Sequence, residues 1–229
     1  MHVAEIWRYP AKSMAGERLA QTELDEQGIP GDRIFQVRRS DDRIVDARAH
    51  PKLLGLRATL DSDGQLWIND ARSDSPVVAQ LVEDAAAVGP GARLVRCESA
   101  GRFDVLPLLV ATDGAIAAFG HDARRLRPNI IVGGVEGLAE RAWEGRALRI
   151  GDVLIGIHSL RRRCVMTTYD PDTQTHDPEV LRQIVRRFDG RLALNCWVIR
   201  RGKIRVGDEV ELAKLNGSVP LESMFGRYA

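Results

Sequence analysis

Short runs in which hydrophobic and polar residues alternate dominate the first seventy positions of the chain. Residues 33–38 and 43–48 lie on either side of a short polar turn, and residues 56–60 and 65–69 lie on either side of another. Alternation with a period of two is typical of half-buried strands, so each pair predicts a β-hairpin. We therefore expect a β-meander that buries one face of a sheet.

The alternation weakens between residues 70 and 104, where Ser, Ala and Gly are frequent and Gly89-Pro90-Gly91 is a firm break. Residues 92–97 predict one further strand, and we place a domain boundary near residue 100. The expected organisation is an N-terminal β domain over residues 1–100, a second domain over residues 101–213 and a tail over residues 214–229.

A continuous apolar run at residues 105–112 predicts a buried strand, and Pro107 within it favours a start at a sheet edge. Asp113 is expected to cap a short helix that ends at Phe119. Further strands are expected at residues 129–132, 147–157, 192–199 and 208–212.

Two phrases in the second half nearly repeat. Residues 148–154 (LRIGDVL) resemble residues 204–210 (IRVGDEV), and each phrase holds a Gly-Asp turn that launches a strand. Such a repeat suits a small closed barrel better than a layered α/β sheet. The fold class we expect is mainly β (α+β), with an N-terminal β-meander or barrel domain packed on a second β-barrel that carries few short helices.

One long amphipathic helix is predicted between the two phrases. Asp177 is expected at its N-cap and Pro178 at its first helical position, because Asp accepts a free backbone N–H and Pro presets φ. Its expected apolar stripe consists of Val180, Leu181, Ile184, Val185 and Phe188.

Composition narrows the classes of partner. The 229 residues are 44% hydrophobic, and 33 basic residues against 32 acidic ones give a formal net charge of +1. This balance gives no global reason to expect nucleic acid or a membrane surface as partner, so any anion site must be local. No apolar run approaches the ~20 residues that span a bilayer, and the opening residues 1–7 read as an amphipathic strand.

Cys97, Cys164 and Cys196 are the three cysteines of the chain. An odd number without a paired C-x-x-C spacing argues against a disulfide framework, a zinc site and a self-contained iron–sulfur cluster. A reducing, cytoplasmic location fits this pattern best.

The richest chemistry lies in residues 161–168, where Cys164 follows three arginines and precedes Thr167 and Thr168. Neighbouring positive charge stabilises a thiolate, which is a nucleophile or a soft metal ligand. Free Cys is also among the most buried residue types and often acts as a small hydrophobe. In an extended segment Arg162 would share a face with Cys164, and Arg161 and Arg163 would share the other. Local sequence leaves the role of the thiol open.

Five separated phrases together resemble the MOSC family (molybdenum cofactor sulfurase C-terminal domains), and in particular its two-part members that look like the mitochondrial amidoxime-reducing component. The match covers roughly residues 3–212, and the phrases occur in the family's order. They are Tyr9-Pro10-Ala11-Lys12-Ser13, Gly31-Asp32-Arg33, Arg127-Pro128-Asn129-Ile130, Arg163-Cys164 with the following residues 167–173, and Val206-Gly207-Asp208.

This resemblance implies a molybdenum cofactor, a molybdopterin whose dithiolene and one protein thiolate hold the metal. It places that thiolate, as metal ligand and catalytic residue, at Cys164, and a soft thiolate suits such a metal. It implies that Lys12, Ser13 and Arg33 hold the cofactor's phosphate and pterin from the N-terminal domain. It also implies that Arg127, Asn129 and Arg163 contact the cofactor from the MOSC domain.

Four further residues receive weaker expectations. Thr112 lies where the family places a small hydroxyl residue at a strand end, and a capping or turn role is the alternative. Asp170 could handle a proton, although a turn role in the phrase Asp170-Pro171-Asp172-Thr173 is favoured. Cys97 and Cys196 lie outside the matched phrases and are expected in the core.

Two departures from the family pattern stand out. Relatives carry a phenylalanine or similar residue before the Arg-Pro-Asn phrase, where this chain has the polar run 123–126, which leaves the substrate-facing rim undefined. Arg161 and Arg162 exceed the pattern, and we expect them to face solvent or a neighbouring strand.

The expected function is that of a molybdenum-cofactor-dependent oxidoreductase that reduces N-hydroxylated or N-oxide-type small molecules. A separate redox protein would deliver the electrons, because the chain shows no cysteine cluster spacing and no G-x-G-x-x-G loop. The alternatives are a sulfur carrier or cofactor-delivery protein that uses Cys164 as persulfide or thiolate, and a pterin-binding domain without a reaction of its own.

Overall fold

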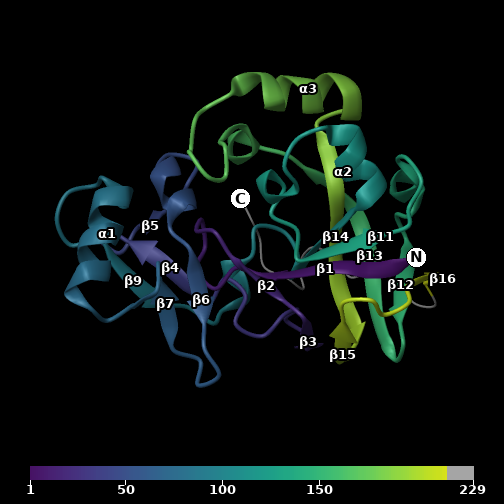
Figure 1. The fold of residues 1–229 in the computed structure, drawn as a ribbon, viewed down its shortest axis with the longest axis horizontal. Helices are drawn as coiled ribbons and strands as arrows, with labels where there is room; N and C mark the ends of the chain where they lie inside the picture. The colour runs from purple at the N-terminus through teal and green to yellow at the C-terminus, as the bar shows by residue number, and fades with distance from the viewer. Residues whose placement is uncertain (216–229) are drawn as a thin grey trace.

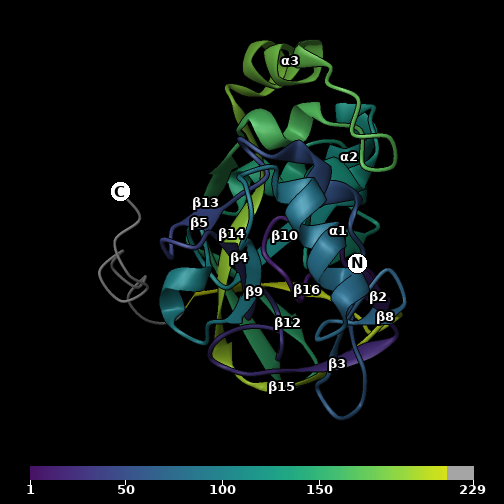
Figure 2. The same cartoon turned by 90° about the vertical axis from the view of Figure 1, so that its left-hand side faces the viewer.

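The computed structural model describes residues 1–215 and shows two lobes built mainly from β-strands (Figure 1). One lobe holds α1 and the strands β4 to β9, and the other is built round a large sheet that α2 and α3 flank. Figure 2 looks onto the smaller lobe, with α1 in front and the strands of the large sheet behind it. This arrangement confirms the mainly β fold class with few short helices.

The large sheet has eight strands in the order β16-β12-β13-β14-β10-β11-β1-β2. Neighbours are antiparallel except β10 and β11, which are parallel. The strands are β1 (His2–Arg8), β2 (Glu17–Leu19), β10 (Leu108–Thr112), β11 (Ile130–Gly133), β12 (Arg146–Ile150), β13 (Val153–Arg162), β14 (Arg191–Arg200) and β16 (Glu211–Lys214).

The sheet curls round one hydrophobic core, because β1 near one end bonds to the segment that leads into β16 at the other. The backbone N–H of Val3 in β1 donates to the carbonyl of Asp208 at 2.9 Å, and that of Val210 donates to Met1 at 2.9 Å, just before β16 begins. Apolar side chains from all parts of the sheet fill the interior, among them fully buried Ile6, Val110, Ile130, Leu148, Ile155 and Leu194.

The smaller lobe confirms both predicted hairpins. Strand β4 (Phe35–Arg38) pairs with β5 (Ile44–Val45) and also with β9 (Arg93–Arg96). Strand β6 (Ala58–Leu60) pairs with β7 (Leu66–Ile68), which continues to β8 (Ala71–Arg72). A separate core holds this lobe together and includes Val37, Leu53, Ala58 and Ile68.

Helix α1 (Pro76–Ala86) is an element that the sequence pattern missed. Ser75 is its N-cap, and its side chain accepts the N–H of Val78. The helix buries Val78, Val82 and Ala86 at four-residue spacing against the smaller lobe. The Ser- and Ala-rich composition hid this stripe, because small side chains give a weak periodic signal.

The first strands of the chain pair with strands of the larger lobe rather than with those of the smaller one. Strand β1 pairs with β11, and β3 (Gln21–Leu24) pairs with β15 (Gly202–Arg205). The chain therefore passes from the large lobe to the small one and back. The division into residues 1–100, 101–213 and a tail stays a prediction, and residues 216–229 of that tail lie outside the described residues.

Helix α3 (Pro178–Phe188) begins as predicted, with the side chain of Asp177 accepting the N–H of Glu179. The predicted apolar stripe of α3 was wrong at Val185, which is 56% exposed on the outer face, whereas Val180, Ile184 and Phe188 are buried.

Two predictions next to α2 (Asp113–Phe119) were wrong. Thr112, not Asp113, is its N-cap, and the Asp113 carboxylate accepts the backbone N–H groups of Gly134 and Val135 instead. Strand β10 does not start at a sheet edge as expected but lies in the interior, between β14 and β11. Pro107 precedes the strand, so its missing N–H removes no hydrogen bond of the sheet.

Short 3₁₀ helices connect the main elements, and one of them follows Cys164. They are η1 (Pro51–Gly55), η2 (Ala100–Arg102), η3 (Ala123–Arg125), η4 (Ala139–Ala142) and η5 (Val165–Thr168). Across residues 1–215, none of the helices combines the length and the apolar character that crossing a membrane requires.

Candidate functional site

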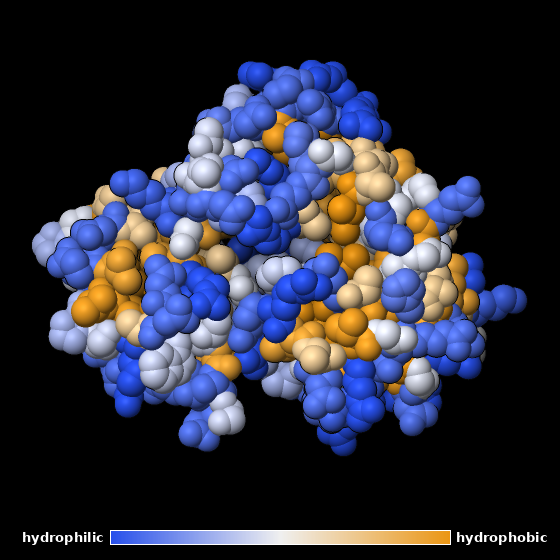
Figure 3. Space-filling view, viewed as in Figure 1, coloured by the Kyte–Doolittle hydropathy of each residue, from blue (hydrophilic) through white to orange (hydrophobic). Residues whose placement is uncertain are grey.

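A hollow of about 620 Å³, partly open to solvent, lies where the two lobes meet. Hydrophilic side chains gather in this region in Figure 3. Eight cationic side chains but only two carboxylates line it, so its wall strongly favours an anion. We call it the cationic pocket; its lining residues are Lys12, Ser13, Arg33, Asp46, Arg48, Asp104, Leu109, Arg125, Leu126, Arg127, Arg161, Arg162, Arg163, Cys164 and Met166.

Cys164 lies in this pocket at the end of β13, as the N-cap residue of η5, and is exposed. Its carbonyl accepts both the backbone N–H of Thr167 at 3.1 Å and the Thr167 hydroxyl at 2.8 Å. The Thr168 hydroxyl donates to the carbonyl of Val165. Both hydroxyls therefore use their proton to fix the backbone after the thiol.

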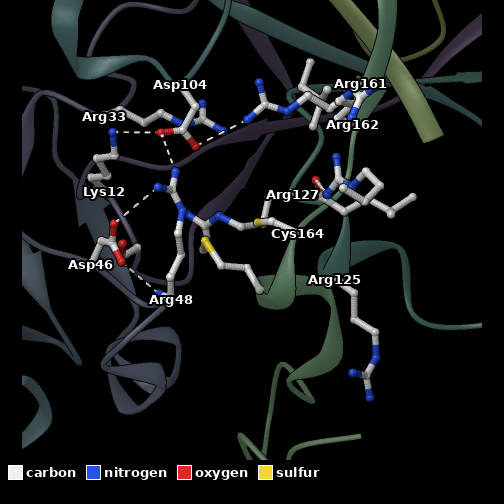
Figure 4. Close-up of a pocket in the computed structure, with 15 residues that line it drawn as sticks. Lys12, Arg33, Asp46, Arg48, Asp104, Arg125, Arg127, Arg161, Arg162 and Cys164 are labelled. Atoms are coloured by element: carbon white, nitrogen blue, oxygen red, sulfur yellow. Dashed lines mark hydrogen bonds and ion pairs between the residues drawn. The ribbon is translucent and has the colours of Figure 1, made fainter. Parts of the chain in front are cut away.

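All three arginines before Cys164 line the same pocket. Figure 4 shows Arg161 and Arg162 beside it, which corrects the expectation that these two face solvent or a neighbouring strand. The pairing of β13 with β14 shifts register between Leu160 and Arg162. Such a bulge breaks the strict alternation of side chains, so neighbouring residues turn to one side. Arg161 is 20% exposed and forms an ion pair with Asp104.

Arg163 and Arg127 bring the least compensated positive charge to the pocket. Burial lowers the pKa of Arg163 to about 9, and burial lowers the pKa of Arg127 to about 10. Within residues 1–215 neither guanidinium forms an ion pair with a carboxylate: Arg163 donates to the Leu126 carbonyl at 2.7 Å, and Arg127 lies over the Tyr9 ring. An anion bound here would stabilise the charged guanidinium groups, which burial disfavours.

Asp104 is the central carboxylate of the cationic pocket. It lies 2.9 Å from Lys12, 3.3 Å from Arg161 and 3.4 Å from Arg48. Burial alone would raise the pKa of Asp104, but the three cations outweigh it and hold that pKa at about 2. Because Lys12 and Arg48 belong to the first hundred residues and Arg161 to β13, this carboxylate ties the two sides of the pocket together.

The Lys12-Ser13 turn lies at the pocket wall, as the family phrase predicts. The ammonium of Lys12 also donates to the Arg102 carbonyl at 3.3 Å. Ser13 is buried with φ at 70°, and its hydroxyl accepts the backbone N–H of Ala47 at 3.0 Å. This bond leaves the Ser13 hydroxyl proton available for a ligand oxygen.

Arg33 lies in the pocket wall, whereas Asn129 supports it from behind. Arg33 forms an ion pair with buried Asp32 and donates to the side-chain oxygen of Asn129 at 3.3 Å. Asn129 is fully buried and accepts the backbone N–H of Leu109 at 3.1 Å. Asn129 therefore orients Arg33 and does not line the cationic pocket.

Thr112 lies away from the cationic pocket, so the capping alternative describes its place in the structure. Its hydroxyl accepts the N–H of Ala115 at 3.1 Å and donates to Glu140 at 3.3 Å. Asp170 accepts the N–H groups of Asp172 and Thr173 and forms an ion pair with Arg125 at 3.0 Å. Its turn role, which the sequence favoured, is the one observed.

The other two cysteines differ from each other. Cys196 lies in the core as expected, where burial raises its thiol pKa. The expectation that Cys97 lies in the core was wrong, because this residue is only half-buried. A hydrogen bond with the Ser99 hydroxyl at 3.3 Å lowers the pKa of the Cys97 thiol. In residues 1–215, no three His, Cys, Asp or Glu side chains cluster as metal ligands.

Three functional candidates lacked a usable sequence signal. Arg48, Asp104 and Arg125 reach the pocket from separate parts of the chain, and none belongs to a phrase that the family shares. Burial opposes the charged form of Arg48, but the carboxylates of Asp104 and Asp46 outweigh burial and raise the pKa of Arg48. Only the folded chain brings such residues together.

Family models match almost the whole described chain. The MOSC N-terminal beta barrel domain matches residues 1–104, and the MOSC domain matches residues 113–211. The chain belongs to the MOSC family. Both models cover the cationic pocket, since Lys12 and Arg33 fall within the first and Cys164 within the second.

Curated members of this MOSC family are distant in sequence. Mitochondrial amidoxime-reducing component 1 of Homo sapiens is 25% identical over 75% of this chain and 67% of its own length. The Mus musculus protein of the same name is 26% identical over 92% of this chain and 82% of its own length. The crystal structure of the YUAD protein from Bacillus subtilis has a TM-score of 0.52 at 14% identity, covering 94% of this chain and 96% of that one, so it shows the fold alone.

Proposed function

We propose that this MOSC protein binds a molybdenum cofactor in the cationic pocket and reduces N-oxygenated small molecules. The observation that carries the proposal is an exposed thiol, Cys164, beside two guanidinium groups, Arg127 and Arg163, that have no carboxylate partner in the described chain. The names of the curated relatives support the reaction type.

The residues of the pocket fit an anionic, phosphate-bearing cofactor. Three buried polar side-chain atoms have no hydrogen-bond partner in the described chain. Two of them are the Nε of Arg163, which lines the pocket, and the hydroxyl of Tyr9, whose ring lies under Arg127. Unsatisfied buried polar groups are costly, so their presence beside eight cationic side chains indicates a ligand that supplies acceptors. Arginine forks match phosphate oxygens, and a single thiolate matches a metal that takes its other ligands from the cofactor.

Each side chain receives a role from its position. Cys164 would ligate the metal, while Arg127 and Arg163 would hold the phosphate together with Lys12 and the Ser13 hydroxyl. When bound, the cofactor supplies the two-electron redox chemistry that no side chain can provide. The protein contributes orientation, charge compensation and access from solvent at exposed Cys164.

Arg33 and its buried support complete the pterin side of the proposed site. Asn129 and Asp32 both bond to Arg33, so its guanidinium is held in one orientation at the wall. The proposal does not include Thr112, whose hydroxyl is used at the start of α2.

A separate redox protein would deliver the electrons, and the cysteine content supports a reducing compartment such as the cytoplasm. We propose no nucleic-acid or membrane partner, because the formal net charge of the chain is only +1. The second candidate function is sulfur or cofactor transfer through Cys164, which its exposure also favours.

The test is elemental and pterin analysis of protein made in a host that synthesises the cofactor. We expect about one molybdenum and one phosphate-bearing pterin per chain, a content that Cys97→Ser retains. Cys164→Ser should lose molybdenum, because a hydroxyl is a poor soft-metal ligand. Protein without molybdenum, but with sulfane sulfur on Cys164, would establish the transfer function instead.

A further inference from the structure

Tyr9 follows β1 directly and is almost completely buried, with only 3% of its surface exposed. It does not line the cationic pocket itself, but two arginines that do line it, Arg33 and Arg127, lie over its ring. The central carbon of the Arg127 guanidinium is 4.3 Å from the ring centroid, and that of Arg33 is 5.2 Å away. Within residues 1–215, Tyr9 is the only ring that lies beneath two guanidinium groups.

The two arginines come from distant parts of the chain and repel each other. Arg33 precedes β4 in the smaller lobe, and Arg127 precedes β11 in the larger one. Burial is the main cause that lowers the pKa of Arg127, and the charge of Arg33 lowers it further. Asp32 compensates Arg33 through an ion pair, whereas Arg127 forms none in the described chain. Because the face of an aromatic ring attracts a guanidinium, the Tyr9 ring is the main described partner of the Arg127 charge.

The Tyr9 ring is held in place from several directions. The backbone N–H of Tyr9 donates to the Asp32 carboxylate at 2.8 Å, and its carbonyl accepts the N–H of Arg33 at 2.7 Å. The Trp7 ring is stacked on it, with centroids 6.3 Å apart and planes 15° from parallel. Gly16 packs so closely that a Cβ added there would lie 2.6 Å from the Tyr9 Cδ1. A ring fixed in this way offers the two arginines a rigid surface, with little further loss of conformational freedom.

The backbone at both arginines is also unusual. The φ angles are 56° at Arg33 and 55° at Arg127, in the left-handed region that residues with a Cβ seldom adopt. Glycine would take this conformation at lower cost, yet both positions carry a long cationic side chain. Backbone strain of this kind persists where the surrounding structure fixes a residue for a purpose. Here the fixed element beneath both side chains is the ring of Tyr9.

We propose that Tyr9 is a positioning residue, whose ring holds the guanidinium groups of Arg33 and Arg127 at the pocket wall in the orientation in which they meet the bound cofactor. This inference deepens the proposed function and rests on it only for the identity of the anion. Burial raises the pKa of Tyr9 to about 12, so the phenol is uncharged near pH 7. The face of the ring, and not a phenolate, therefore attracts the arginines.

The first test measures binding of inorganic pyrophosphate to cofactor-free protein by calorimetry. Tyr9→Leu should weaken it roughly 5- to 30-fold, because the arginines lose the surface that orients them. Tyr9→Phe keeps the ring and should stay within about threefold of the wild type. Its fold should be intact, since the lost hydroxyl has no hydrogen-bond partner in the described chain. Equal losses in the two variants would overturn the proposal, as would a wild-type pocket that binds no pyrophosphate.

A graded series separates attraction to the ring from packing, and it does not depend on the folding of Tyr9→Leu. Phenylalanine analogues with increasing numbers of ring fluorine atoms keep nearly the same shape but withdraw electron density from the ring face. At position 9 they should weaken pyrophosphate binding step by step from the Tyr9→Phe level. Phe188, a buried ring beneath Arg187 in a separate core, is the control: Phe188→Leu should cost stability and leave the affinity unchanged. Affinity that does not respond to fluorination would contradict the role of the ring.

A double-mutant cycle asks whether Tyr9 acts through Arg127. In an Arg127→Gln background, Tyr9→Leu should weaken pyrophosphate binding by less than about threefold, because the guanidinium that depends most on the ring is gone. A merely structural tyrosine would give the same loss in both backgrounds. That additive result would overturn the proposal.

Cofactor-loaded protein separates this inference from the proposed function. In a host that makes the cofactor, Tyr9→Leu should lose bound molybdenum and pterin, and Tyr9→Phe should retain most of both. Wild-type protein without molybdenum would defeat the proposed function alone, since the pyrophosphate measurements still decide the role of Tyr9. Molybdenum-loaded wild type, together with a Tyr9→Leu variant of unchanged pyrophosphate affinity, would defeat this inference alone.

Discussion

The carboxylate of Asp104 lies 2.9 Å from the ammonium of Lys12, in a pocket where cations outnumber carboxylates by eight to two. The same carboxylate reaches Arg161 at 3.3 Å and Arg48 at 3.4 Å. A single negative charge thus holds three cations at the wall where an anionic ligand is expected. This arrangement has a consequence for the stability of the cofactor-free protein.

Asp104→Asn is expected to lower the free energy of unfolding of cofactor-free protein by about 1–2 kcal/mol at pH 7. The folded pKa of Asp104, about 2, is below the usual value, so its stabilisation is present above pH ~4 and is lost as the pH falls toward 2. Urea unfolding at pH 7 and pH 3 measures the difference. A stability gap between the two proteins that stays constant down to the lowest pH would contradict this linkage.

Arg127→Gln and Arg163→Gln are expected to lower cofactor occupancy while leaving the cofactor-free fold intact. Loss of one charged hydrogen-bond partner at a partly buried phosphate weakens binding by roughly 1.5–3 kcal/mol, about 10- to 100-fold. The measurement is molybdenum per chain, with activity per bound molybdenum changing far less. Arg72→Gln, an exposed arginine paired with Asp74, is the matched control; equal occupancy in all three variants would remove Arg127 and Arg163 from the site.

Cys196→Ser is expected to destabilise the fold and Cys97→Ser to be nearly neutral. The Cys196 side chain is fully buried in β14, where a serine hydroxyl would lose its water and cost roughly 1–3 kcal/mol. Cys97 is half-buried beside Ser99, so its change should stay within about 0.5 kcal/mol. Urea unfolding at pH 7 compares them, and similar losses in both would show that Cys97 packs as a core residue.

Reduction of benzamidoxime by molybdenum-loaded protein is expected with a reduced viologen and not with NADH or NADPH alone. The sequence shows no G-x-G-x-x-G loop that opens a helix after a strand, the usual signature of nicotinamide binding. Substrate-dependent viologen oxidation measures the activity, with Cys164→Ser as the inactive control. Turnover driven by NADH in pure protein, or activity that survives the Cys164 change, would contradict the proposed mechanism.

The residues that sequence could place correctly are those whose role is local. The Asp177-Pro178 start of α3 depends on a cap that neighbours in the chain provide, and the two hairpins depend on period-two patterns beside a turn. The Lys12-Ser13 turn and Cys164 likewise belong to short phrases shared with the family, and the pocket contains both.

The residues that sequence could not place depend on contacts between distant segments. Asp104 becomes a site residue only because β13 brings Arg161 to it, and the facing of Arg161 depends on a bulge that pairing with β14 creates. Thr112 is the N-cap of α2 and does not line the cationic pocket, and its position in the sequence alone did not show which contacts it makes. Helix α1 escaped notice because alanine marks a buried face only weakly.

The pairing of β1 with β11, and of β3 with β15, also governs the order in which the protein can be built during synthesis. A ribosome releases β1 first, yet its partner strand ends at Gly133 and the last partner of β3 ends at Arg205. The smaller lobe can gather its own core early, because its strands and α1 are neighbours in the chain. The wall that carries Cys164 follows β13, which pairs with β14, so this wall waits for most of the chain to emerge, and a cofactor can be received only near the end of translation.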